Sequence, residues 1–302
     1  MQVGCQRIDI EVVIGHVLSL ISWVRHCLPS AVWKSRPICR TSLGGDSVFV
    51  VLNLAVYLCE LSGQWMIVMQ AHRFRVGMPE NSPQPPITTN IAPYACAFEL
   101  ALGVLALWVG WIVNQLPHAS IPTASEHLLS NAYAVGWGGV AALPMLALFF
   151  LVNKLSIKPI ASIRDHLDNN LLPLFTGSRL WELAAVALAA GIGEELLFRG
   201  LLQPLLASAF EPPVGVWIAF IATSVIFGLC HWLTPTYAVF ATLLGLYLGG
   251  LFLWTDNLLA PITAHALYDL VALIYLVQRL RKRRARCAAT HSPLPAQIDQ
   301  EP

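Results

Sequence analysis

One short segment, GEELLFRG at 193–200, places two carboxylates and a guanidinium inside a stretch of sequence that is otherwise apolar. Glu194, Glu195 and Arg199 lie within six positions of one another. Three charged side chains near the centre of a membrane helix together cost on the order of 8–10 kcal/mol, so they must face protein, water or one another. On a helix, Glu195 and Arg199 share a face and can pair, whereas Glu194 points about 100° away from Glu195.

Two further apolar stretches carry histidine. The segment FGLCH runs from Phe227 to His231, and the segment HALYD runs from His265 to Asp269. His265 and Asp269 are four positions apart, so on a helix the carboxylate can orient the imidazole or act on the same target. Gathered at one point with the glutamates and the arginine, these groups supply a base, two imidazoles, a carboxylate and a cation, which are the parts of a water-activating site.

The composition places these residues in a membrane protein. The chain has 302 residues, of which 56% are hydrophobic and only 12% are charged. Its mean hydropathy is +0.63. Soluble domains usually carry about 25% charged residues, so the chain belongs to the membrane class. The net charge of +1 gives no indication of a nucleic-acid partner, and the seven scattered cysteines form no CxxC pair.

Apolar runs of the length that crosses a bilayer predict an all-α fold, a polytopic bundle of about seven to eight transmembrane helices. The seven runs are 48–70, 91–115, 132–152, 180–207, 214–233, 236–254 and 257–277. The segment 10–28 is a further candidate, although its charged residues favour an interfacial helix or a disordered segment.

The spans and the loops between them divide the chain into five parts. These are an N-terminal segment of unassigned role (1–47), the leading transmembrane helices (48–152), a cytoplasmic, partly helical connector (153–178), a catalytic transmembrane core (179–277) and a basic, disordered cytoplasmic tail (278–302). Lys and Arg gather in the connector and the tail, whereas the loops 116–131, 208–213 and 255–256 contain neither. This positive-inside pattern predicts that the C-terminus is cytoplasmic.

The three motifs, in this order, resemble those of the CPBP intramembrane proteases. This family includes the CAAX prenyl endopeptidases and bacterial relatives linked to bacteriocin processing. Its pattern is Glu-Glu-x-x-x-Arg, then Phe-x-x-x-His, then His-x-x-x-Asn or Asp, and the resemblance covers about 178–277. It implies an intramembrane endopeptidase that acts on membrane-associated or lipidated peptides within the lipid bilayer.

The resemblance also implies a role for each motif residue. Glu194 would be the catalytic carboxylate and His231 its partner in activating water, while His265 and Asp269 would polarise the substrate carbonyl and stabilise the oxyanion. The supporting residues would be Glu195, Arg199 and Phe227. The third motif ends in Asp269, where the prenyl-protein enzymes carry Asn, and this difference weakens the transfer of a prenylated substrate to this chain.

Other functions remain open at this point. Intramembrane carboxylates and histidines also serve proton-coupled transporters, although we find no internal repeat. A haem-binding membrane protein would use His231 and His265 as axial ligands. Glu194, His231, His265 and Asp269 are also a candidate ligand set for Zn²⁺, but no HExxH motif occurs and a glutamate mechanism needs no metal. The isolated residues Glu60 and Glu99 we interpret as structural.

Overall fold

The computed structural model describes residues 90–121 and 124–290. In this part of the chain every regular element is a helix and there is no strand, as expected for the all-α fold. The candidate segment 10–28 and the predicted span 48–70, which contains Glu60, lie outside the described residues.

Four helices are long and apolar enough to cross a membrane, and they confirm an integral membrane protein. They are α3 (Ala92–Ile112), α4 (Ala124–Lys154), α9 (Pro235–Thr255) and α10 (Leu259–Thr290). A shorter apolar helix, α8 (Val214–Cys230), precedes α9. The predicted total of seven to eight spans is not confirmed, because the described residues supply four helices of that length.

The predicted span at 180–207 is built from three successive helical segments. It consists of α6 (Leu180–Glu195), the π-helical segment η5 (Leu196–Leu202) and α7 (Gln203–Ala207). All seven residues of η5 are buried, Arg199 among them. A π-helical segment adds a residue to the turn and often marks a functional site, and here it directly follows the two glutamates of the first motif.

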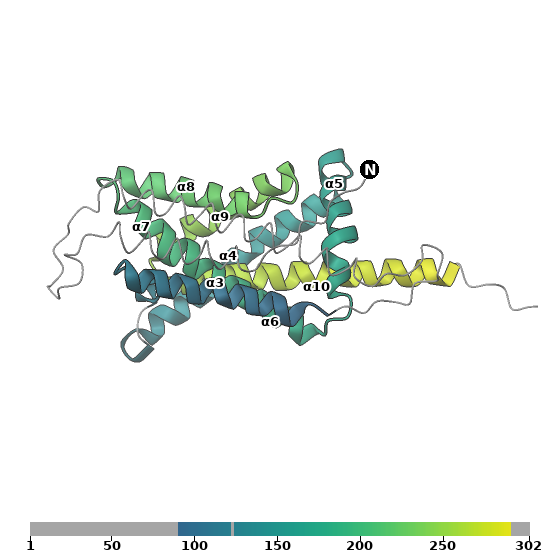
Figure 1. The fold of residues 1–302 in the computed structure, drawn as a ribbon, viewed down its shortest axis with the longest axis horizontal. Coiled ribbons are helices and arrows are strands. Elements are labelled where there is room, and N and C mark those ends of the chain that lie inside the picture. Colours follow the sequence, from purple (N-terminus) through teal and green to yellow (C-terminus); the bar gives the residue numbers. More distant parts are fainter. Residues whose placement is uncertain (1–89, 122–123, 291–302) are drawn as a thin grey trace, which may run out of the picture.

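Small residues let the helices of the core approach closely, as in other membrane bundles. α6 packs against α3 and α10, and α8 packs against α9 (Figure 1). A Cβ atom at Gly193 would collide with the backbone carbonyl of Glu99 on α3, and one at Gly228 would collide with the Thr242 hydroxyl on α9. These contacts bring the first two motifs close to their neighbouring helices.

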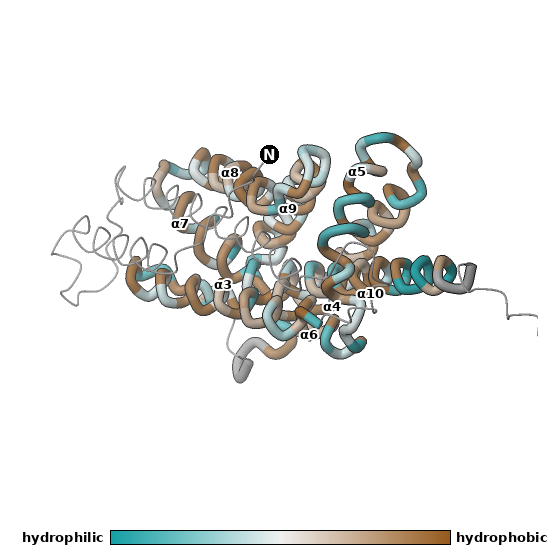
Figure 2. The backbone as a smooth tube through the Cα atoms, turned by 45° about the vertical axis from the view of Figure 1, so that its right-hand side comes forward, coloured by the Kyte–Doolittle hydropathy of each residue, from teal (hydrophilic) through white to brown (hydrophobic). Residues whose placement is uncertain are grey.

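The connector is partly helical, as predicted. It contains α5 (Lys158–His166), the π-helical segment η3 (Leu167–Leu171) and the 3-10 helix η4 (Leu172–Phe175). A second 3-10 helix, η2 (Pro117–Ser120), follows α3. In Figure 2 hydrophilic residues concentrate on α5 and on the C-terminal part of α10, whereas the rest of the bundle is mainly hydrophobic.

The prediction that the last helix ends at 277 and gives way to a disordered tail is wrong for residues 278–290. These residues continue α10 without a break. Contacts with the connector explain the extension: Arg279 and Arg283 both pair with Asp168 of η3, at 2.5 and 2.9 Å. Arg281 also donates hydrogen bonds to the carbonyls of Thr176 and Ser178. The basic residues therefore hold the end of the helix against the connector.

Candidate active site

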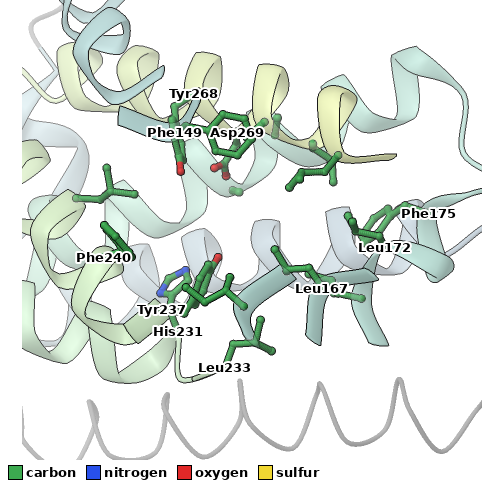
Figure 3. Close-up of a pocket in the computed structure, with 18 of the residues that line it drawn as sticks. Phe149, Leu167, Leu172, Phe175, His231, Leu233, Tyr237, Phe240, Tyr268 and Asp269 are labelled. Atoms are coloured by element: carbon green, nitrogen blue, oxygen red, sulfur yellow. The ribbon is translucent and has the colours of Figure 1, made fainter. Parts of the chain in front are cut away.

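The four predicted catalytic side chains come from three elements that meet inside the bundle. Glu194 lies in the last turn of α6, and His231 is the residue that directly follows α8. His265 and Asp269 occupy successive turns of α10. In Figure 3 the labelled side chains of His231 and Asp269 lie on facing sides of one cavity.

Glu194 and His231 face each other across a short gap. The Nε2 atom of His231 lies 3.7 Å from Oε1 of Glu194, which is beyond direct hydrogen-bond length. The other ring nitrogen, Nδ1, is 2.8 Å from the carbonyl oxygen of Phe227. A carbonyl can only accept, so Nδ1 carries the hydrogen and, in the neutral ring, Nε2 presents a lone pair to Glu194. A single water molecule can bond to both groups across such a gap.

Glu195 joins the first motif to the third through one oxygen atom. Its Oε1 accepts a hydrogen bond from Nη1 of Arg199 at 2.6 Å and lies 2.8 Å from Nδ1 of His265. The carboxylate is fully buried, and Arg199 is 2% exposed. Arg199 completes its bonds by donating to the carbonyl of Gly245 on α9. The predicted pairing of Glu195 with Arg199 is therefore present, and Glu195 has the additional role of orienting His265.

His265 lies between two carboxylates. Its Nδ1 faces Glu195, and its Nε2 lies 3.5 Å from Oδ2 of Asp269. The Asp269 side chain is 33% exposed, whereas that of His265 is 7% exposed. Glu195 engages Nδ1, whereas the 3.5 Å between Nε2 and Asp269 is longer than a direct hydrogen bond. The Glu195 carboxylate can only accept, so Nδ1 carries a hydrogen, and as an imidazolium His265 can also donate from Nε2 beside Asp269.

Phe227 connects the cation of the first motif to the histidine of the second. Its ring stacks on the imidazole of His231, with centroids 4.4 Å apart. The guanidinium carbon of Arg199 lies 4.7 Å from the centroid of the same ring, within the range of a cation–π contact. With its carbonyl bonded to His231, Phe227 fixes both the position and the hydrogen of that imidazole.

The site opens on a cavity of about 400 Å³. Glu194, His231 and Asp269 line it, whereas His265 does not. Most of the remaining wall is apolar, and Leu167, Leu172 and Phe175 of the connector lie further along it in Figure 3. The cavity can therefore hold an apolar chain next to polar groups.

Glu99 is a cavity residue that sequence reasoning missed. Interpreted above as structural, it lines the same cavity as Glu194, His231 and Asp269. Its Oε2 atom is buried and has no hydrogen-bond partner in the part of the chain that the structure describes. In the sequence, the only sign of this role was that Glu99 is a single carboxylate in an apolar span. Glu99 lies near Glu194 because α3 and α6 approach each other closely at Gly193.

Among the described residues, no three His, Cys, Asp or Glu side chains converge closely enough to hold a metal ion. The dependence on zinc considered for Glu194, His231, His265 and Asp269 stays a prediction to be tested.

Comparison with known families supports the resemblance seen in the motifs. Residues 176–271 match the model of the family described as type II CAAX prenyl endopeptidase Rce1-like. The matched segment contains all three motifs and ends just after Asp269. It confirms the resemblance to the CPBP intramembrane proteases over this part of the chain. No match was found among the curated proteins or among the solved structures.

Proposed function

We propose that this chain, an integral membrane protein whose core matches the CAAX-type family, is an intramembrane endopeptidase that hydrolyses membrane-associated or lipidated peptides. The observation that carries the proposal is the placement of Glu194 and His231 on the wall of an apolar cavity, 3.7 Å apart. Neither residue is committed to a cationic side chain, unlike Glu195, so both are available to a water molecule.

The proposed reaction begins with a water molecule held between Glu194 and His231. The Glu194 carboxylate accepts a proton from the water, and the oxygen attacks the carbonyl carbon of the scissile peptide bond. A tetrahedral intermediate forms and its oxygen becomes negatively charged. When the C–N bond breaks, the leaving nitrogen takes the proton from Glu194, which restores the carboxylate for the next cycle.

His265 is the proposed donor to the oxyanion. As an imidazolium, His265 donates from Nδ1 to Glu195, and its Nε2–H faces Asp269, which lines the cavity. An Nε2–H held in this direction is preorganised to stabilise negative charge as it develops. Asp269 positions that hydrogen in the free enzyme, and the substrate oxygen competes for it during the reaction.

The apolar wall of the cavity supports a lipid-embedded substrate. Residues of α4, α9 and α10, among them Met145, Phe149, Phe240 and Leu273, form this wall. An extended peptide with apolar side chains, or one attached to a lipid, can lie against it without exposing polar groups to hydrocarbon. Burial of apolar surface then favours its binding.

Peptide mass spectrometry of membrane fractions tests the proposal. Cells that express the wild type, Glu194→Gln or Glu182→Gln are compared at equal protein levels. Glu182 is the matched control, since it lies in the first turn of the same helix and accepts from the Arg179 backbone, away from the cavity. We expect cleavage products with the wild type and Glu182→Gln only. Identical peptide profiles for the wild type and Glu194→Gln would refute the proposed activity.

A further inference from the structure

The proposed hydrolysis produces an oxyanion, and few of the catalytic groups can donate a hydrogen bond to it. Glu194 and Asp269 line the cavity with carboxylates, which only accept when they are ionised. The Nδ1–H of His231 is committed to the Phe227 carbonyl, and in the neutral ring Nε2 presents a lone pair. His265 supplies an Nε2–H but does not itself line the cavity. A donor on the cavity wall would therefore complete the site.

Two tyrosine hydroxyls are candidates for this donor. Tyr237 of α9 and Tyr268 of α10 both line the cavity, and in Figure 3 their hydroxyls point into it. Neither hydroxyl makes a hydrogen bond within the described part of the chain. A phenol ordinarily keeps its hydrogen up to about pH 10, so both side chains are donors at neutral pH.

The turn between α8 and α9 places Tyr237 beside His231. His231 directly follows α8, and Tyr237 lies in the first turn of α9. The Phe227 carbonyl holds the imidazole on one side of this turn, and on the other side the Thr234 hydroxyl accepts from the backbone N–H of Tyr237 at 3.1 Å. In Figure 3 the side chains of His231 and Tyr237 lie next to each other, across the cavity from Asp269. The local fold therefore fixes the phenol next to the imidazole.

Tyr237 is better placed than Tyr268 to reach the reacting atoms. It shares its side of the cavity with His231, which together with Glu194 holds the proposed water. Tyr268 comes instead from the facing helix, where it directly precedes Asp269. Both Glu194 and Asp269 lie close enough to the Tyr237 hydroxyl for their charges to act on it. A carbonyl attacked by the water would therefore lie within reach of the Tyr237 hydroxyl.

We propose that the Tyr237 hydroxyl donates a hydrogen bond to the oxyanion of the tetrahedral intermediate, as a second donor beside His265. The hydroxyl keeps its hydrogen throughout, because the proton of the water goes to Glu194 and from there to the leaving nitrogen. A donor that is already in place stabilises the charge as it develops, since it needs no reorganisation at that moment. This inference rests on the proposed peptidase function and adds to it a catalytic residue outside the three motifs.

Cleavage kinetics of the full-length protein in phosphatidylcholine nanodiscs test the inference. The probe is an N-palmitoylated peptide of apolar residues that carries a fluorophore at one end and a quencher at the other. Tyr237→Phe removes the donor and keeps the ring, so we expect kcat to fall roughly 10²-fold while KM stays nearly constant. Tyr247→Phe is the matched control, because Tyr247 lies on the same helix, donates to the Ala141 carbonyl and does not line the cavity. It should leave both constants unchanged.

Two inhibitors distinguish a lost donor from a disturbed cavity. A phosphinic analogue of the peptide places a tetrahedral P–O⁻ group where the oxyanion forms, whereas a reduced analogue with CH₂–NH in place of the amide has no oxygen there. Tyr237→Phe should weaken binding of the phosphinic analogue by about the factor by which kcat/KM falls, and it should leave binding of the reduced analogue unchanged. Equal weakening of both analogues would overturn the proposal. So would a loss of kcat and of phosphinic binding that occurs in Tyr268→Phe and not in Tyr237→Phe.

The same measurements separate this inference from the proposed function. If Glu194→Gln abolishes cleavage but Tyr237→Phe retains the wild-type kcat, the peptidase stands and the oxyanion donor is wrong. If the wild type cleaves no peptide but binds the phosphinic analogue in a manner that depends on the Tyr237 hydroxyl, the donor stands and the proposed hydrolysis is wrong for such peptides. If the wild type neither cleaves the peptide nor binds the analogue, both are wrong.

Discussion

The Nδ1 atom of His265 lies 2.8 Å from Oε1 of Glu195, and this buried contact joins positions 70 residues apart in the chain. The same oxygen accepts from Arg199. Glu195 therefore links the first and third motifs, because its carboxylate contacts both an arginine and a histidine.

Glu195→Gln is expected to lower both stability and activity. Removing one partner of a buried ion pair costs about 3–5 kcal/mol, because the remaining charge is left without compensation. A glutamine also presents an amide, which cannot serve Arg199 and His265 through one charged oxygen. We expect a clear fall in Tm, measured by thermal denaturation of the purified protein, together with slower cleavage.

The double variant Glu195→Gln/Arg199→Gln separates the two effects. Without the arginine no unpaired buried cation remains, so part of the lost Tm should return. Activity should stay low, since His265 still lacks its carboxylate. Full recovery of activity in the double variant would show that Glu195 does not orient His265.

Glu194→Gln and His231→Ala are each expected to abolish measurable cleavage while the protein still inserts in the membrane. Loss of a general base usually lowers the rate by about 10²–10⁴-fold. Neither residue pairs with Arg199, so the ion pair inside the bundle should survive both changes. Cleavage rates and membrane-fraction yields provide the measurement, with Glu182→Gln as the control. Substantial activity in Glu194→Gln would rule out the mechanism.

Local spacing explains which features of the site were predictable. Glu195 and Arg199 are one turn apart, so their pairing follows from helix geometry alone. The contact of Glu195 with His265 depends on how α6 packs against α10, which spacing within one helix does not determine. The same holds for Glu99, whose place beside the site depends on the approach of α3 at Gly193.

The helix boundaries, too, were predictable only where the local sequence determines them. Apolar runs predicted α3, α9 and the membrane part of α10, because a bilayer requires about 20 apolar residues. The continuation of α10 to Thr290 was missed, since its residues are basic and their partner, Asp168, lies in a separate segment. The π-helical segment that carries Arg199 has no local sequence signature either.

Glu99→Gln is expected to raise stability and lower activity. A buried carboxylate oxygen without a partner is costly, and a neutral amide of the same shape reduces that cost. Because Glu99 lines the cavity with Glu194, its loss should also change the polarity met by the water and the substrate. Tm and cleavage rate are measured on the same preparation. A lower Tm with unchanged activity would show that Glu99 has only a structural role.

Prolonged treatment with a chelator is expected to leave activity intact. In the proposed mechanism Glu194 and His231 activate water themselves, and Nδ1 of His265 is engaged by Glu195. Purified active protein should therefore contain no stoichiometric zinc by elemental analysis. If chelation abolished activity and Zn²⁺ restored it, the protein would still be a peptidase, but Glu194, His231, His265 and Asp269 would be metal ligands.

The membrane orientation is the last prediction. Basic residues gather in the connector and at the end of α10, and the contacts of Asp168 with Arg279 and Arg283 place these two regions on the same side. By the positive-inside rule that side is the cytoplasm, and η2 lies on the other side.

Thiol labelling measures the orientation directly. The exposed Cys287 near the end of α10 and an introduced Ala119→Cys in η2 are compared, each as the sole cysteine of an otherwise cysteine-free chain. An impermeant maleimide should label the residue at 119 in intact cells and the residue at 287 only after the membrane is opened. Labelling of Cys287 in intact cells would reverse the orientation, and it would place the connector and the end of α10 on the outer side.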